Sequence, residues 1–244
     1  MNRWFFALLM IAGLGAAGTG VRAAEFTPAQ RTEIVSIVRE ALKQDPSILR
    51  DALTALQVDE SAKTDEASRA AIASSRNDLV NSRDPVAGNP NGDVTIVEFF
   101  DTRCPYCRRM EPVMSDFLAQ DRNVRLVFKD LPILGPGSVL GSKALLAAKR
   151  QGAYLKMREA VMRLPTNTTM AQLEQTARHL GLDWPRMEKD MNDPAVQAQI
   201  DANLDLARKI GIQGTPAFVI GTELVPGAID APDLRKAVEA ARHG

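Results

Sequence analysis

The chain of 244 residues contains only two cysteines, Cys104 and Cys107, and only two histidines. A zinc site needs further ligands close to such a pair, but no third cysteine exists and His179 and His243 lie far away in the sequence. A purely structural disulfide is also poorly motivated, because a bridge across a two-residue gap closes almost no loop in the unfolded chain. The scarcity of cysteine therefore favours a redox function for this pair.

The chain also lacks an excess of charge and a long basic run. It has 30 basic and 30 acidic residues, which gives a net charge of zero. Proteins that bind the phosphate backbone of nucleic acids usually carry a basic patch or a basic arm. We therefore expect no nucleic-acid partner.

The N-terminus lacks an apolar run as long as the roughly 20 residues that a membrane span requires. Arg3 is followed by a shorter apolar stretch, residues 4–14, and then by small residues. Val21 and Ala23 place small side chains at the −3 and −1 positions of a cleavage site. We predict a secretory signal peptide over residues 1–23; an uncleaved membrane anchor is the alternative.

The two cysteines enclose only Pro105 and Tyr106, a spacing at which one thiol can attack a disulfide and the other can resolve the mixed disulfide. The preceding run, residues 94–100, is apolar and β-branched, which is typical of a buried parallel strand. After Cys107, apolar residues recur at helical spacings, namely Met110, Val113, Met114, Phe117 and Leu118. The pair is thus expected where a strand leads into a helix, whose free N–H groups and dipole stabilise a thiolate.

Residues 24–57 precede this region and predict two short amphipathic helices. Thr27 can cap the first helix with Pro28 at its first position, and Asp45–Pro46 separates the two. The apolar stripes consist of Ile34, Ile37, Val38, Ala41 and Leu42, and of Ile48, Leu49, Ala52, Leu53 and Leu56. Two short helices cannot bury such stripes alone. We predict that residues 24–57 form an oligomerisation segment; the alternative is that they fold back on their own catalytic domain.

The remaining chain divides into a polar segment and an α/β domain. Residues 58–85 contain few large apolar residues and predict a solvated helical linker, and the turn-rich stretch 84–93 marks a boundary. Residues 86–244 contain strands on both sides of a helical block, which predicts an α/β sheet with an inserted helical subdomain. The expected elements are strands at 94–100 and 124–128, helices over about 138–210, a hairpin at 217–220 and 222–225, and a last helix at 230–242.

Two motifs resemble those of DsbA-type thioredoxin-fold proteins. Residues 98–107, Glu-Phe-Phe-Asp-Thr-Arg-Cys-Pro-Tyr-Cys, resemble the active-site segment of the family. Residues 214–219, Gly-Thr-Pro-Ala-Phe-Val, resemble its Thr–cis-Pro loop, and a helical insertion separates the two motifs. The N-terminal extension is similar to that of the ScsC branch and its Com1-like relatives. The resemblance implies an α/β thioredoxin fold with an inserted helical subdomain and an N-terminal helical extension.

The resemblance also implies roles for individual residues. Cys104 matches the attacking thiol and Cys107 the resolving thiol, which together form the redox-active disulfide. Glu98 matches a buried acid behind the active-site helix, and a desolvated carboxylate can relay protons. No cofactor and no bound metal are implied. The positions that contact the substrate are Pro105, Tyr106, Thr215 and Pro216, with a cis bond before Pro216.

The expected function is periplasmic thiol–disulfide exchange on secreted proteins. Tyr106 stands where the strongest oxidants of the family have histidine, and a neutral tyrosine predicts a less oxidising couple, nearer an isomerase or reductase. The expected partners are misfolded or disulfide-bonded secreted clients, a membrane reductant of the ScsB or DsbD type, and further copies of the chain, with a trimer favoured. The alternatives are a DsbA-like oxidase that is re-oxidised by a DsbB-like enzyme, or a copper- or zinc-binding thiol protein.

Overall fold

The computed structural model describes residues 26–243. The signal peptide predicted over residues 1–23 lies outside this part of the chain. The described residues form two compact units, residues 26–57 and residues 58–243.

The first unit contains helix α1, Pro28–Gln44, and the start of helix α2, Ser47–Ser74. Thr27 is the N-cap of α1 and forms a capping box with Gln30, while Pro28 occupies the first turn, as predicted. No residue of α1 is buried. Within residues 28–57, the large aliphatic side chains of the two helices are exposed, by 37% for Leu42 up to 61% for Ile37.

The second unit is built on a mixed five-stranded sheet in the order β1-β3-β2-β4-β5. Strands β2 and β3 are parallel, and the other neighbouring pairs are antiparallel. The two central strands are the apolar runs that the sequence predicts. The strands are β1 Val86–Gly88, β2 Val94–Phe100, β3 Val124–Asp130, β4 Ala217–Ile220 and β5 Glu223–Pro226.

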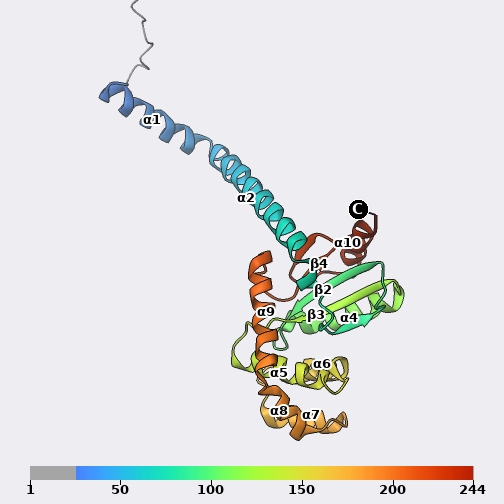
Figure 1. Cartoon of the computed structure of the whole chain (residues 1–244). Coiled ribbons are helices and arrows are strands. Elements are labelled where there is room, and N and C mark those ends of the chain that lie inside the picture. Colours follow the sequence, from blue (N-terminus) through green and yellow to red (C-terminus); the bar gives the residue numbers. More distant parts are fainter. Residues whose placement is uncertain (1–25, 244) are drawn as a thin grey trace, which may run out of the picture. The chain divides into compact units, whose positions relative to one another are not determined.

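Helices cover both faces of this sheet, and α5 to α8 gather at one end of it (Figure 1). The helical block predicted over about 138–210 and the last helix are both confirmed. The active-site helix α4 and α10 pack on the face of the sheet that carries Phe100, and the C-terminal half of α9 packs on the opposite face. The helices are α4 Pro105–Gln120, α5 Pro136–Lys149, α6 Tyr154–Arg163, α7 Met170–His179, α8 Trp184–Met191, α9 Pro194–Ile210 and α10 Ala231–His243.

The alternation of side chains along β2 divides the interior into two cores. Val97 and Phe99 point into the core that contains Ile210 of α9. Ile96 and Phe100 point into the other core, against α4, α5 and α6. Glu98 lies between Ile96 and Phe100 and therefore faces the second of these cores, beneath the active-site helix.

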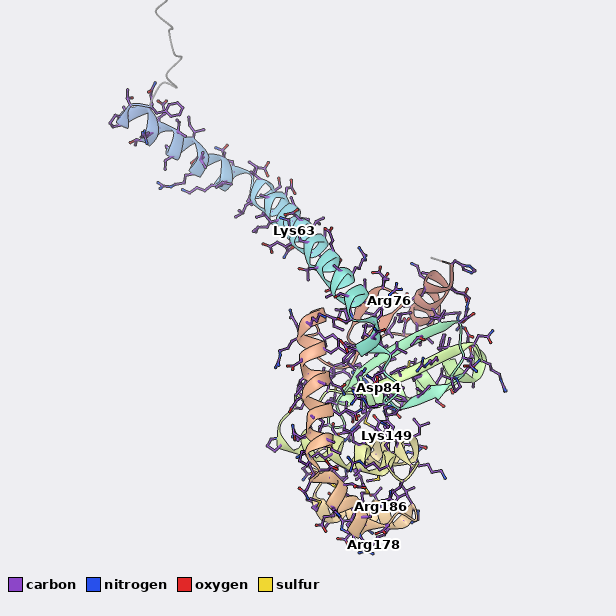
Figure 2. All side chains as sticks on the ribbon, in the orientation of Figure 1. Lys63, Arg76, Asp84, Lys149, Arg178 and Arg186 are labelled. Atoms are coloured by element: carbon purple, nitrogen blue, oxygen red, sulfur yellow. The ribbon has the colours of Figure 1, made fainter. Side chains whose placement is uncertain are left out.

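The prediction of a solvated linker over residues 58–85 is wrong for its second half. Ile72 and Leu79 are 1% and 3% exposed and belong to the core on the α9 face of the sheet. Asp84 forms a buried ion pair with Lys129 at 2.6 Å, and Figure 2 shows Asp84 beside the sheet. A single buried isoleucine, Ile72, attaches the C-terminal end of α2 to this core, and the polar composition of residues 58–85 does not reveal such a contact.

Two further differences concern residues 76–88. A short helix, α3, spans Arg76–Leu79, and strand β1 lies within the stretch 84–93, which was predicted to be a turn-rich boundary. Strand β1 pairs with β3 at the edge of the sheet, with Val86 opposite Val127. The three residues Val86–Gly88 carry too little alternation to be recognised as a strand. The folded domain thus begins near residue 68 and not at 86.

Candidate active site

The two cysteines lie at the junction of a strand and a helix, as predicted. Strand β2 ends at Phe100, and α4 begins at Pro105 with Cys104 as its N-cap. Both cysteines are free thiols in the structure. Both are buried, but Cys104 is 4% exposed and Cys107 is 0% exposed, so Cys104 is the thiol nearer to solvent.

The loop before β4 meets Cys104, although the two are more than a hundred residues apart in sequence. The Cys104 thiol donates a hydrogen bond to the backbone oxygen of Thr215, with a sulfur–oxygen distance of 3.1 Å. The Thr215–Pro216 peptide bond is cis, as predicted. Tyr106, in the first turn of α4, is 53% exposed. The structure therefore brings the predicted motifs into one site at the surface.

Asp101 fixes the turn that carries Cys104, a contribution that the sequence analysis missed. Its carboxylate accepts hydrogen bonds from the backbone N–H groups of Arg103 at 2.7 Å, Ile133 at 2.9 Å and Leu134 at 3.0 Å. A single buried carboxylate thus joins the active-site turn to the loop that follows β3. The available signal was its position directly after a buried strand and three residues before Cys104.

Arg108 and Arg109 differ in what they contact. The Arg108 guanidinium donates to the backbone oxygens of Thr102 at 2.9 Å and Leu164 at 2.6 Å, so it ties α4 to the helical insertion. Arg109 stacks on the ring of Tyr106, with its guanidinium carbon 4.2 Å from the ring centroid. Arg108 therefore holds backbone segments together, whereas Arg109 lies at the exposed surface beside Tyr106.

Glu98 is a buried carboxyl with a strongly shifted pKa. It is 1% exposed, and burial raises its pKa from 4.5 to about 7, although Arg158 at 3.1 Å lowers the pKa and Glu111 raises it. One of its oxygens, Oε1, has no hydrogen-bond partner among the described residues. A group that titrates near neutral pH and has a free oxygen can accept and return a proton.

Cys107 is another buried ionisable group of the site. Burial raises the pKa of the Cys107 thiol well above its ordinary value, while a backbone hydrogen bond with Asp101 lowers it and the charges of Cys104 and Glu98 raise it. Cys107 is therefore a neutral thiol at physiological pH and needs a base before it can attack. Glu98 is the buried carboxylate whose charge acts on this thiol.

Arg158 forms an ion pair with the buried Glu98, and its role was not predicted from the sequence. It projects from α6, pairs with both Glu98 and Glu111, and is 5% exposed. Its guanidinium lies over the rings of Phe100 and Phe128, at 4.3 and 4.2 Å from the ring centroids. The two rings and two carboxylates hold the charge of Arg158 in one position.

The raised pKa of Glu98 predicts a pH dependence of stability. Between pH 4.5 and 7 the folded protein binds more protons at Glu98 than the unfolded chain does, so the free energy of unfolding falls as pH rises. Glu98 contributes about 3 kcal/mol to this fall, and Asp130, whose pKa burial also raises to about 7, acts in the same direction. Urea unfolding across this range should show a flatter dependence for Glu98→Gln.

The control for this prediction is Glu159→Gln, on the exposed surface of α6. It should leave the slope of unfolding free energy against pH as it is in the wild type. A Glu98→Gln protein with the wild-type slope would contradict the shifted pKa.

Between residues 26 and 243, no group of three or more His, Cys, Asp or Glu side chains is arranged to hold a metal ion. None of the helices in the same range combines the length and apolar character that crossing a membrane requires.

The fold and the paired thiols beside a cis-proline loop define a thioredoxin-fold thiol–disulfide oxidoreductase. Residues 95–239 match the family described as DSBA-like thioredoxin domain, and the chain belongs to this family. Residues 30–63 match the family described as copper resistance protein ScsC N-terminal domain. The layout predicted from the sequence, a DsbA-type domain with an ScsC-type extension, is thereby confirmed.

Similar proteins include solved structures and a longer curated protein. A thioredoxin-like oxidoreductase from Silicibacter pomeroyi DSS-3 is 43% identical, with a TM-score of 0.67, over 69% of this chain and 98% of that one. A linker-deletion mutant of Proteus mirabilis ScsC is 30% identical, with a TM-score of 0.65, over 90% and 98%. A Na⁺/H⁺ antiporter NhaA 3 from Salinispora tropica is 30% identical over 65% of this chain, which spans only 25% of the antiporter.

Proposed function

We propose that this protein is a disulfide isomerase or reductase that acts on exported proteins in the periplasm. The observation that supports this most directly is the division between the two thiols. Cys104 is the less buried thiol and contacts the loop containing Thr215, whereas Cys107 is fully buried in the core that Glu98 faces, and the charge of this carboxyl, whose pKa is about 7, acts on the Cys107 thiol. An attacking thiol and a resolving thiol with its own base need these two environments.

The exchange proceeds in two steps. The Cys104 thiolate attacks one sulfur of a client disulfide, the client S–S bond breaks, and the other client sulfur leaves as a thiolate. In isomerisation, that or another client thiolate attacks the mixed disulfide, forms a new client disulfide and releases Cys104, so the client keeps its oxidation state. In reduction, Cys107 transfers its proton to Glu98 and attacks Cys104, which releases a client reduced by two electrons and leaves the Cys104–Cys107 disulfide.

The segment 24–57 supports isomerisation over simple oxidation. Its helices expose a large set of aliphatic side chains, and each such side chain gains roughly 1.5–3 kcal/mol when it is fully buried. Association with further copies, which we take to be a trimer, is the way in which these side chains leave water. Several Cys104–Cys107 pairs around one client could then break a wrong bond and form another. The neutral Tyr106 supports the same assignment, because it cannot stabilise a Cys104 thiolate as a histidinium would.

The proposed role requires an electron supply and a location. An isomerase must be kept in its dithiol form, so we assign it a membrane reductant of the ScsB or DsbD type. The predicted signal peptide, residues 1–23, would export the protein to the periplasm. A DsbB-like oxidant would be the partner if the protein were an oxidase, and the redox state of Cys104 in cells distinguishes the two.

The oligomer is tested with variants of the full mature chain. Replacing Ile37 and Leu53, one on each stripe, with lysine should convert a trimer into a monomer in light scattering. The same protein should lose the ability to restore scrambled ribonuclease and should still reduce small disulfides, which need only one thiol pair. The matched control is Ser36→Lys with Thr54→Lys, which places the same charges at exposed polar positions of the same helices.

Two results would contradict this assignment. The first is a wild-type protein that is monomeric at tens of micromolar concentration. The second is a variant with Ile37→Lys and Leu53→Lys that keeps the wild-type mass. Deletions should remove residues 24–57 only, because Ile72 and Leu79 belong to the core of the catalytic domain.

A further inference from the structure

A pocket of about 340 Å³ lies beside the loop that contacts Cys104. One wall is formed by Thr64, Asp65 and Ser68 of α2, and the rest by residues 211–217 and by the end of β5. The volume is at the small end of the range for ligand pockets, roughly 300–1,000 Å³. Such a pocket can take one long side chain and not a whole cofactor.

Helix α2 is held at this position by three contacts. Ile72 is buried in the core with Ala217 of β4, and the C-terminal end of α2 meets the domain beside β4 (Figure 1). Arg69 donates to both carboxylate oxygens of Glu223 in β5, at 2.8 and 3.0 Å. Ser68 is 8% exposed and packs against Gly211. The wall of the pocket is thus part of the catalytic domain.

The pocket is continuous with the place where a client would bind. Thr215 lines it, and the backbone oxygen of Thr215 is 3.1 Å from the Cys104 sulfur. A client cysteine joined to Cys104 therefore places its neighbouring residues at the mouth of the pocket. An extended client segment spans about 3.3–3.6 Å per residue, so the relevant side chain belongs to a residue close to the client cysteine.

The lining has one charge. Asp65 is the only ionisable residue among those that form the pocket, and the others are apolar, small or neutral polar. Arg69, one turn further along α2, is engaged by Glu223 and so does not pair with Asp65. An apolar pocket with one carboxylate at its edge complements an aliphatic stem that ends in a cation.

We propose that this pocket binds a lysine or arginine side chain of the client, next to the cysteine that is exchanged, and that Asp65 selects for its charge. The proposal rests on the proposed function, because it takes the loop at Thr215 as the client site. It makes the extension helix α2 part of the specificity of the enzyme, in addition to its connection with the oligomerisation segment.

The test uses the reduced full mature protein and a pair of peptides, each linked through its one cysteine to glutathione. The peptides differ in a single residue, lysine or glutamate, placed in turn one or two positions before and after the cysteine. We expect the lysine peptide to react about three to five times faster at one of these positions. The ratio should fall to about one in Asp65→Asn, reverse in Asp65→Lys, and shrink in 1 M salt.

Glu66→Lys is the matched control, because it makes the same charge change on the next residue of α2, which does not line the pocket. It should keep the preference for lysine. Equal rates for both peptides with wild-type protein, or equal effects of Asp65→Lys and Glu66→Lys, would overturn the proposal. So would a changed assembly mass in Asp65→Lys, since another copy of the chain would then cover the pocket. If wild-type protein reacted with neither peptide, the proposed function itself would fail.

Discussion

Cys107→Ser protein should accumulate as a covalent complex with its clients, whereas Cys104→Ser protein should form none. In the first variant the less buried thiol still attacks, but the fully buried thiol that would release the client is absent. In the second variant the attack itself is lost, and reduction of client disulfides should fall by about 10³-fold or more. Non-reducing gels of protein mixed with a disulfide-bonded client, run with and without a reductant, measure both effects.

The control is the double variant Cys104→Ser with Cys107→Ser, which should give neither complex nor turnover. Serine is close to cysteine in size, but a buried hydroxyl at position 107 costs about 1–3 kcal/mol of unfolding free energy, so urea unfolding must show that each variant is folded under the assay conditions. Equal trapping by Cys104→Ser and Cys107→Ser would contradict the division of roles between the two thiols.

Arg158→Leu should cost about 3–5 kcal/mol of unfolding free energy, the usual loss when one partner of a buried ion pair is removed. Without Arg158, the Glu98 carboxylate has no cation beside it in the core, and its pKa rises further because Arg158 is the group that lowers it. The attack of Cys107 on the mixed disulfide, which releases the client, should also become slower near pH 7, because a protonated Glu98 cannot accept the proton of Cys107. Urea unfolding and stopped-flow kinetics measure these two effects.

Two variants show whether the effect comes from the charge. Arg163→Leu removes an exposed arginine from the last turn of the same helix and should cost less than about 1 kcal/mol. Adding Glu98→Gln to Arg158→Leu should recover part of the lost stability, because the buried carboxylate is then gone. If Arg158→Leu and Arg163→Leu lost the same stability, Arg158 would have no special position.

The central sheet was predictable because its signals are local. Residues 94–100 form one mainly apolar and β-branched run, and strand β2 has these limits in the structure. The capping box at Thr27 and the break at Asp45–Pro46 were likewise visible as short motifs. Such features depend on neighbouring residues, which the sequence lists in order.

The missed features depend on packing between distant segments. Arg158 matters only because α6 packs against β2, sixty residues earlier in the chain, and a charged residue in a helix usually indicates an exposed face. Ile72 looked like an isolated apolar residue in a polar helix until the fold placed it against β4. The pocket at Asp65 has no sequence motif, since its walls come from α2, the loop before β4 and the end of β5.

A map of the first thiol to react would show directly whether Cys104 is the attacking thiol. Reduced wild-type protein is treated at neutral pH with less than one equivalent of an alkylating reagent, digested, and analysed by mass spectrometry. We expect the label almost entirely on Cys104, because Cys107 is fully buried and burial keeps it protonated. A label that is found mainly on Cys107, or divided equally between the two cysteines, would contradict this expectation.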